Sequence, residues 1–479
     1  MFPTRHHCQA LLGLALGALI ATTFNDVFVA AGDPGNCQWM EEVDVAIVGA
    51  GVAGLMAAYK LEEAGYSVKV LEARNRICGR LENQPVGDTG YVVEGGGQWV
   101  GPTQDRVLAL IDTLGLETFK THLTGSGRVR TGDAVTPFDV DINQEDPERD
   151  ALSAQLDELA AKVPLDKPWE APNAEELDAM TFGDWVKENV NTTGGEMLIN
   201  GLLNSALIEP DASKVSMLFM LYWLRSLGGA KITTAFHGGA QDSRVVGGTG
   251  AICDSLMKRL GDETVLLDTP VTDIIRKRNG AVVESAKVIV KAKRVVLTCQ
   301  PQTCGKIEFY PGLPAERIKL QDALQKQKPI PSSTKLHFVY ETPFWRDDGL
   351  SGFSLSTITG LCVDNSPPDG KIGVIMCFGS ADSELEEKDY LEEFAVLYGP
   401  KAWDLKSRIV KDWSKDAEWT ATCVTSVPPG VMTSSWKTIR EPIGVLHFAG
   451  GETSQVWMGY IDGAVRSAEI VAEEIASLL

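Results

Sequence analysis

The chain has 479 residues, which is enough for two or more structural domains with a large hydrophobic core. Acidic residues (65) outnumber basic residues (44), so the formal net charge is −21. An acidic surface repels phosphate backbones, which argues against nucleic-acid binding. Apart from His6 and His7 near the N-terminus, the histidines are dispersed, and no Cys-x-x-Cys pair occurs, so the sequence predicts no metal site.

The N-terminal segment 1–31 has the features of a secretory signal peptide. A short polar region precedes an apolar run, Ala10–Ala21, which is shorter than the about 20 residues of a membrane-spanning helix. Small residues around Ala31 fit cleavage after that position, and an uncleaved anchor is the alternative interpretation. We therefore expect a secreted or secretory-pathway protein with no stable membrane anchor after cleavage.

Nine cysteines are scattered along the chain. Their spacing does not match a dense disulfide scaffold, although one or two disulfides remain possible in an oxidising compartment. We expect most of these cysteines to be buried small hydrophobic residues. Cys423, in "WTATCVTSVPPGVM", has three interpretations: a buried side chain, half of a disulfide, or a covalent attachment point for a cofactor.

The first predicted elements after the leader form a strand–helix–strand unit. Asp44–Val48 is a short apolar strand, and the apolar residues of Leu55–Glu63 have helical spacing. A second strand, "YSVKVLE", ends in Glu72. This order of elements is typical of a nucleotide-binding domain.

Three glycines between the first strand and the helix have the dinucleotide-binding spacing Gly-x-Gly-x-x-Gly. Gly49 permits the tight turn, Gly51 lets a pyrophosphate approach the backbone, and Gly54 lets the helix pack close to the strand. The N-terminus of the helix offers unpaired N–H groups to the phosphates, and Glu72 is placed to accept hydrogen bonds from ribose hydroxyls. The unit predicts a dinucleotide site without distinguishing NAD from FAD.

Three further motifs decide between these cofactors by resemblance. "EARNRICGR" (72–80), "EGGGQWVGPTQDRV" (94–107) and "FAGGETSQVWMGYIDGAV" (448–465) resemble motifs of the flavin amine oxidases, and of the flavin monoamine oxidases most closely. Cys78 stands in place of the first glycine of the family's Arg-x-Gly-Gly-Arg signature. The resemblance covers nearly everything from Val43 onward and implies that FAD is the cofactor.

The resemblance also implies the fold class. We expect an α/β protein in which a discontinuous, Rossmann-like FAD-binding domain carries an inserted α+β substrate domain, as in two-domain flavoproteins of the glutathione reductase type. The expected FAD-binding segments are 42–115, 242–305 and 426–479, and the expected substrate-binding segments are 116–241 and 306–425. Helical periodicity within Pro147–Val163 and Ser213–Leu227, and a strand at Thr334–Glu341, fit this division.

The matching family positions give the expected site residues. The predicted cofactor contacts are Gly49, Gly51, Gly54, Glu72, Arg74, Arg80, Gly97, Gln98, Trp99, Val271, Cys423, Gly451, Glu452, Tyr460 and Ile461. The predicted catalytic residues are Lys335, Tyr460 and Trp413, and the predicted substrate contacts are Gln241, Val424, Tyr460, Ala206 and Leu207. Lys335 matches the lysine that holds a water against the flavin.

Two of these positions bear on the substrate and on flavin attachment. Tyr460 matches one wall of the family's aromatic cage, whereas Val424 stands where the second wall is usually tyrosine. A half-open cage favours a longer aliphatic amine over a small aromatic one. Cys423 matches the cysteine that bonds covalently to the flavin in animal relatives, although its flanking residues differ, so covalent attachment and a free thiol beside the ring both stay open.

We therefore expect FAD-dependent oxidative deamination of a primary amine by O₂, with an aliphatic or long-chain amine as the substrate. We also expect a homodimer. Within the same fold, a polyamine oxidase or an L-amino-acid oxidase is an alternative. A non-catalytic flavin-binding protein is the alternative from another class. Amine-dependent bleaching of the flavin distinguishes the enzyme from the binding protein.

Overall fold

The computed structural model describes residues 39–140, 146–207, 209, 211–326, 334–379 and 385–479. These residues belong to one compact unit. The predicted signal peptide and two cysteines, Cys8 and Cys37, lie outside the described residues. Within the described ranges, no helix is long and apolar enough to cross a membrane.

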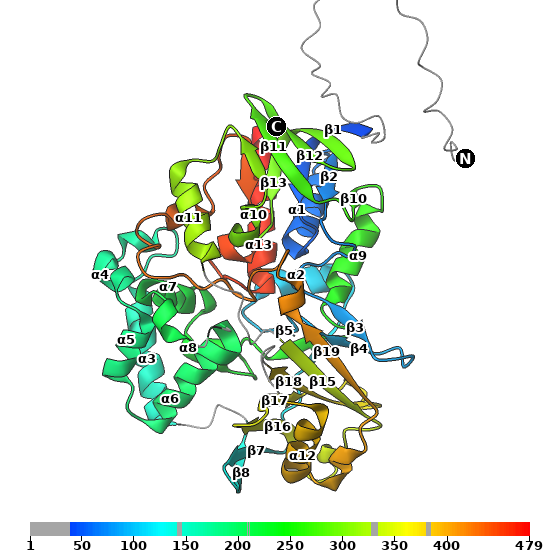
Figure 1. Ribbon diagram of the computed structural model, residues 1–479, viewed down its shortest axis with the longest axis vertical. Helices are drawn as coiled ribbons and strands as arrows, with labels where there is room; N and C mark the ends of the chain where they lie inside the picture. The colour runs from blue at the N-terminus through cyan, green and yellow to red at the C-terminus, as the bar shows by residue number, and fades with distance from the viewer. Residues whose placement is uncertain (1–38, 141–145, 208, 210, 327–333, 380–384) are drawn as a thin grey trace, which may run out of the picture. The chain divides into compact units, whose positions relative to one another are not determined.

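The first sheet is mostly parallel and contains strands from distant parts of the chain. Its strand order is β10-β2-β1-β13-β12-β11-β14, with β20 paired to β13. Figure 1 shows the blue strands β1 and β2 in the same region as the green strands β11 to β13. The bounds are β1 Trp39–Val48, β2 Val68–Leu71, β10 Val265–Leu266, β11 Val271–Lys277, β12 Gly280–Ser285, β13 Val288–Leu297, β14 Glu308–Tyr310 and β20 Leu446–Phe448.

Two details of this sheet differ from the sequence-based expectation. Strand β1 begins at Trp39, before the expected Asp44, because residues 39–43 continue the parallel pairing with β13. Strand β14 pairs with β11, although its residues fall in the segment expected to bind substrate. The hydrogen-bond ladder therefore extends the first sheet beyond residue 305.

Three helices that pack together stand against this sheet: α1 (Val52–Glu63), α9 (Gly250–Leu260) and α13 (Ile461–Leu478). Helix α1 contacts both of the others, so its apolar residues are buried almost all round, in contrast to a surface helix. It begins at Val52 rather than at the expected Leu55, since Gly51 is its N-cap residue. The start of α1 therefore lies directly at the glycine turn.

The second sheet is built from later parts of the chain, in the order β19-β15-β18-β17-β16-β7-β8. The expected strand at 334–341 is present as β15, and all of its residues are buried, so both of its faces pack against other parts of the protein. Helix α12 (Glu387–Tyr398) covers one face, where the ring centroids of Phe338 and Phe394 are 5.0 Å apart. The bounds are β7 Ser126–Thr131, β8 Ala134–Asp139, β15 Thr334–Tyr340, β16 Leu350–Ser356, β17 Gly360–Asp364, β18 Gly373–Gly379 and β19 Ser407–Asp412.

The helices α3 to α8, within residues 147–234, form a separate hydrophobic core. Its centre is α7, whose apolar residues are buried on every side. The bounds are α3 Pro147–Ala161, α4 Ala174–Ala179, α5 Phe182–Asn189, α6 Thr193–Asn200, α7 Met217–Leu227 and α8 Ala230–Thr234. The remaining elements include α2 Asp105–Thr113, α10 Pro301–Cys304, α11 Ala315–Gln325, the pair β3 Asn83–Pro85 and β4 Val92–Glu94, and the small sheet of β5 Trp99–Val100, β9 Ser243–Val245 and β6 Thr118–Lys120.

The cysteines are paired more extensively than expected. Three disulfides join Cys78 to Cys253, Cys299 to Cys304 and Cys362 to Cys377. Among the described cysteines, Cys423 is the unpaired one. The expectation that most cysteines are unpaired hydrophobic residues is therefore wrong, because pairing depends on chain segments that meet only in the tertiary structure.

Candidate active site

The glycine turn between β1 and α1 has the geometry of a diphosphate site. Gly49 has φ of 104°, which favours glycine. A Cβ at Gly51 would lie 3.8 Å from the Cα of Gly79 and meet nothing closer, so the space in front of Gly51 is open. The unpaired N–H groups of α1 therefore face a region that a phosphate can reach.

Glu72 follows β2 and is buried beside this turn. One carboxylate oxygen accepts a hydrogen bond from the N–H of Ala50 at 2.7 Å, and the other accepts one from the N–H of Arg74 at 3.0 Å. Each carboxylate oxygen has a second acceptor position, so these bonds orient the group and leave it able to bind hydroxyls. The carboxylate thus stabilises the turn and lines the same space.

One continuous cavity contains most of the predicted site residues. Those that line it are Gly49, Gly51, Glu72, Arg74, Arg80, Gly97, Gln98, Trp99, Ala206, Gln241, Val271, Lys335, Trp413, Cys423, Val424, Gly451, Tyr460 and Ile461. They come from the first sheet, from the helical segment and from β15 of the second sheet. The cavity therefore joins the expected cofactor site to the expected substrate site.

Three predicted residues do not line this cavity. Gly54 lies against the turn, where a Cβ would be 1.9 Å from the carbonyl oxygen of Gly49. Leu207 is buried in the helical core instead of the substrate site. Glu452 is buried behind the lining and binds Arg80. Gly54 therefore affects the site through the turn at Gly49, and Glu452 affects it through Arg80.

The ion pair of Arg80 and Glu452 is bidentate. The guanidinium nitrogens of Arg80 lie 2.7 and 2.9 Å from the two carboxylate oxygens, and Nη1 also donates to the carbonyl oxygen of Cys423 at 2.7 Å. Although burial alone would raise it, the Arg80 guanidinium holds the pKa of Glu452 below its ordinary value. The pair therefore stays charged and ties Arg80 to the Cys423 segment.

Lys335 projects from β15 into the cavity. Its ammonium donates to the carbonyl oxygen of Gly96 at 2.7 Å and to Oε1 of Gln98. It also lies 5.5 Å from the ring centroid of Trp99 and 5.6 Å from that of Phe378. Burial lowers the pKa of Lys335 to about 8, so this side chain can hold or release a proton near neutral pH.

A buried polar network supports Lys335. Nε2 of Gln98 donates to Oδ1 of Asn365 at 2.8 Å, which turns the Gln98 oxygen toward the lysine. Nη2 of Arg244 donates to Glu94 at 2.6 Å, and Nη1 donates to the carbonyl oxygen of Asn365 at 3.0 Å. Glu94 begins the quoted segment 94–107, yet nothing in the sequence pairs it with Arg244, and no sequence signal indicated Asn365.

Aromatic residues and a valine line the part of the cavity near Tyr460. The rings of Tyr460 and Trp457 are 5.1 Å apart and nearly perpendicular, which fixes the tyrosine ring. Val424 packs against the backbone of Gly459, the residue before Tyr460, since a Cβ at Gly459 would lie 2.7 Å from Cγ1 of Val424. Nε1 of Trp413 donates to the carbonyl oxygen of Gly95 at 2.7 Å, so Trp413 holds the 94–99 segment.

Cys423 and Gln241 each present a reactive or polar atom to the cavity. The Cys423 side chain is accessible from the cavity, and burial within the protein raises the pKa of its thiol. Nε2 of Gln241 donates to the carbonyl oxygen of Thr233 at 3.2 Å. Its Oε1 accepts no hydrogen bond from the residues that the structure describes and can therefore accept one from a substrate N–H group.

Comparison with known proteins identifies the family. Residues 52–476 match the family described as flavin containing amine oxidoreductase. The chain belongs to this flavin amine oxidase family. It is 30% identical to a probable flavin-containing monoamine oxidase A of Dictyostelium discoideum, with 91% of this chain and 98% of the relative covered. It is 34% identical to the putative flavin-containing monoamine oxidase AofH of Mycobacterium tuberculosis, with 93% and 98% covered.

Solved structures of flavin amine oxidases have the same fold. Putrescine oxidase bound to putrescine superposes with a TM-score of 0.83 at 30% identity, covering 91% of this chain and 100% of that one. Cyclohexylamine oxidase from Brevibacterium oxydans also gives 0.83 at 30% identity, covering 91% and 99%. The expected α/β flavoprotein fold is confirmed, and this flavin amine oxidase is an enzyme with FAD as its cofactor.

The residues present fit FAD. The open space at Gly51 admits a diphosphate to the N-terminus of α1, and the Glu72 carboxylate is free to bind ribose hydroxyls. Arg80, Gly451 and Ile461 line the continuation of the same cavity toward Lys335. FAD held by these residues would supply the redox chemistry of amine oxidation.

Proposed function

We propose that this flavin amine oxidase deaminates a primary aliphatic amine by the reaction RCH₂NH₂ + O₂ + H₂O → RCHO + NH₃ + H₂O₂. The observation that carries the proposal is the charge of the cavity lining. Among the described residues, Glu72 is the single carboxylate in that lining, and it lies at the nucleotide end. The described part of the substrate end therefore offers no carboxylate to a second amino group, which disfavours a polyamine or diamine.

The arginines of the lining argue against an amino acid. Arg80 is held by Glu452, and Arg74 lies beside Glu72 with Nη1 donating to Thr420 at 3.3 Å. Recognition of a substrate carboxylate requires a guanidinium aimed at it. Arg80 is instead bound by Glu452 and Arg74 lies beside Glu72 at the nucleotide end, which supports an amine without a carboxylate.

Tyr460, Val424 and Gln241 have distinct roles in this proposal. The fixed face of Tyr460 orients the amine, and the Gln241 oxygen accepts a hydrogen bond from its nitrogen. Val424 leaves space where a second aromatic wall would stand, which favours a long alkyl chain. Lys335 holds a proton near the reacting atoms and, with a pKa of about 8, can exchange it at the pH of turnover.

The test is anaerobic mixing of the yellow protein with amines of graded length. Butylamine, longer alkylamines, a long-chain amino-alcohol, benzylamine, spermidine and an L-amino acid are compared by bleaching of the flavin absorbance. Each buried methylene contributes about 0.8 kcal/mol, so the specificity should rise about fourfold per carbon until the chain fills the cavity. A preference for benzylamine over long alkylamines would contradict the proposal.

The alternatives predict different results in the same experiment. Faster bleaching by spermidine or by the amino acid would support a polyamine or an amino-acid oxidase. If every amine leaves the flavin oxidised while dithionite bleaches it, the protein binds flavin without turning over amines. Benzylamine serves as the matched aromatic control for the alkyl series.

We also propose that the protein follows the secretory route and forms a homodimer. Disulfides persist in oxidising compartments, so the three pairs among the described cysteines support the first part. N-terminal sequencing of the secreted protein should begin at residue 32. Retention of residues 1–31 would contradict cleavage, and light scattering at the monomer mass would contradict the dimer.

A further inference from the structure

The loop that carries Cys78 forms one wall of the flavin cavity beside the glycine turn. The N–H of Cys78 donates to the carbonyl oxygen of Ala50 at 2.8 Å, and Cys78 forms a parallel bridge with Gly51. The next residues, Gly79 and Arg80, line the cavity together with Cys78. The position of this loop therefore sets the width of the space in which the diphosphate binds.

Cys78 has a backbone conformation that disfavours a cysteine. Its φ is 79°, in the left-handed region, where glycine is the usual residue. The family signature has a glycine at this position, whereas this chain has a side chain with a Cβ. The loop therefore needs a further restraint to remain in the conformation that leaves Gly51 open.

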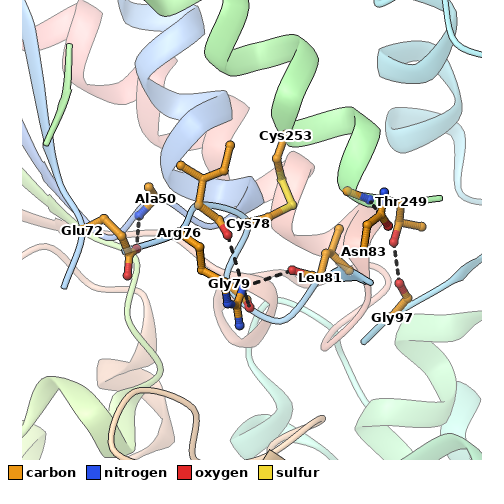
Figure 2. The surroundings of a disulfide bond; sticks show 12 residues. Ala50, Glu72, Arg76, Cys78, Gly79, Leu81, Asn83, Gly97, Thr249 and Cys253 are labelled. Atoms are coloured by element: carbon orange, nitrogen blue, oxygen red, sulfur yellow. Dashed lines mark hydrogen bonds between the residues drawn. A yellow bond between two sulfur atoms is a disulfide. The ribbon is translucent and has the colours of Figure 1, made fainter. Parts of the chain in front are cut away.

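That restraint is a disulfide to a distant helix. Cys78 bonds to Cys253, which lies 175 residues later on α9, with the two Cα atoms 5.5 Å apart. Cys253 is fully buried and does not line the cavity. Figure 2 shows the bond reaching from the loop to helix α9. The disulfide to Cys78 is therefore the covalent link between Cys253 and the cavity wall.

Hydrogen bonds place the start of α9 against the same cavity segments. Oδ1 of Asn83 accepts from the N–H of Gly250 at 3.1 Å, and Oγ1 of Thr249 donates to the carbonyl oxygen of Gly97 at 2.6 Å (Figure 2). Helix α9 also packs on α1. The helix is thus a fixed support to which the loop is covalently attached.

We propose that the Cys78–Cys253 disulfide holds residues 78–80 in the conformation that binds the FAD diphosphate, so that Cys253 is a positioning residue for the cofactor. The proposal rests on FAD occupying this cavity. Without the bond, Cys78 leaves the left-handed region and the loop moves relative to Gly51. The bound flavin is then released faster, while the rest of the fold persists.

The test measures spontaneous release of flavin from diluted holoenzyme as the rise in free FAD fluorescence. All proteins carry Cys423→Ala, so that covalent attachment cannot mask release. Cys253→Ala should release FAD at least tenfold faster than its parent, which corresponds to about 1.4 kcal/mol in the activation free energy of release. Cys78→Gly combined with Cys253→Ala should return release to within about threefold of the parent, because glycine accepts φ of 79° without the bond.

The matched control removes another disulfide. Cys362 and Cys377 pair across β17 and β18, and neither lines the cavity. Their double alanine variant should unfold at a lower temperature and yet release FAD within about twofold of the parent. A similar acceleration in this control would show that general stability, and not the loop, governs retention, and would overturn the proposal.

Two further outcomes would overturn it. One is parental release from Cys253→Ala, and the other is a failure of glycine at position 78 to slow release. If Cys253→Ala does not fold, the double variant Cys78→Gly with Cys253→Ala is the test. Folding and parental FAD release in this variant would support the proposal, because glycine allows the loop conformation without the disulfide. A wild-type protein that takes up no FAD would instead overturn the flavin site itself, which distinguishes that failure from the failure of the disulfide proposal.

Discussion

Substitutions at two glycines of the turn should fail for different reasons. A Cβ at Gly54 would lie 1.9 Å from the carbonyl oxygen of Gly49 and 3.0 Å from its carbonyl carbon. Because carbon and oxygen normally approach to about 3.3 Å, Gly54→Ala must move α1 or the turn by more than ~1 Å. Overpacking of this kind lowers the free energy of unfolding by about 1–3 kcal/mol. Because both the helix and the turn are rigid backbone, we expect a loss near ~3 kcal/mol for Gly54→Ala.

Gly51→Ala should leave the fold intact and affect only the cofactor. The nearest atom to its Cβ would be the Cα of Gly79 at 3.8 Å, which is an ordinary contact. The stability of the apoprotein should therefore change by less than about 0.5 kcal/mol. The new methyl group occupies the space that the diphosphate needs, so FAD should bind at least tenfold more weakly, or by about 1.4 kcal/mol.

The assay is thermal unfolding of each variant with and without added FAD, together with its flavin content after purification. Gly312→Ala is the matched control, since a Cβ there would meet nothing within 4 Å and its backbone has no positive φ. Equal unfolding temperatures for Gly54→Ala and Gly312→Ala would refute the packing argument. Parental FAD affinity in Gly51→Ala would refute the assignment of this turn to the diphosphate.

Three other variants test the rest of the site. Burial lowers the pKa of Lys335 from 10.5 to about 8, so between these pH values the unfolded chain binds more protons than the folded protein. The free energy of unfolding of the wild type should therefore rise from pH 8 to pH 10.5 by up to about 3 kcal/mol. Lys335→Met should lack this rise when the free energy of unfolding is measured with urea from pH 8 to 10. The same pH dependence in the variant and the wild type would contradict the burial argument. Val424→Tyr should lower the ratio of long alkylamine to benzylamine turnover about tenfold, and an unchanged ratio would exclude Val424 from the pocket. Glu94→Gln leaves the buried charge of Arg244 unpaired and should destabilise the protein by about 3–5 kcal/mol in thermal unfolding. Adding Arg244→Met should recover part of this loss, and no recovery would contradict the pairing argument.

The sequence by itself predicted the nucleotide-binding unit correctly in its order of elements. The fingerprint glycines and Glu72 lie within one strand–turn–helix–strand segment, so their relation depends on local backbone geometry and on periodicity. The resemblance then placed residues such as Lys335 and Tyr460, and the structure brings both to the cavity. The element boundaries, as at Trp39 and Val52, were less exact because pairing and capping partners decide them.

Only the tertiary structure decided the contacts between distant segments. The pairing of Cys78 with Cys253, the ion pair of Glu94 with Arg244 and the bond from Gln98 to Asn365 each join residues more than a hundred positions apart. No local period or spacing encodes such a partner, since it depends on which faces of the sheets and helices meet. For the same reason the sequence could not show that β15 is buried on both faces: α12 packs on Phe338 and β4 packs on Val339 only once the chain has folded.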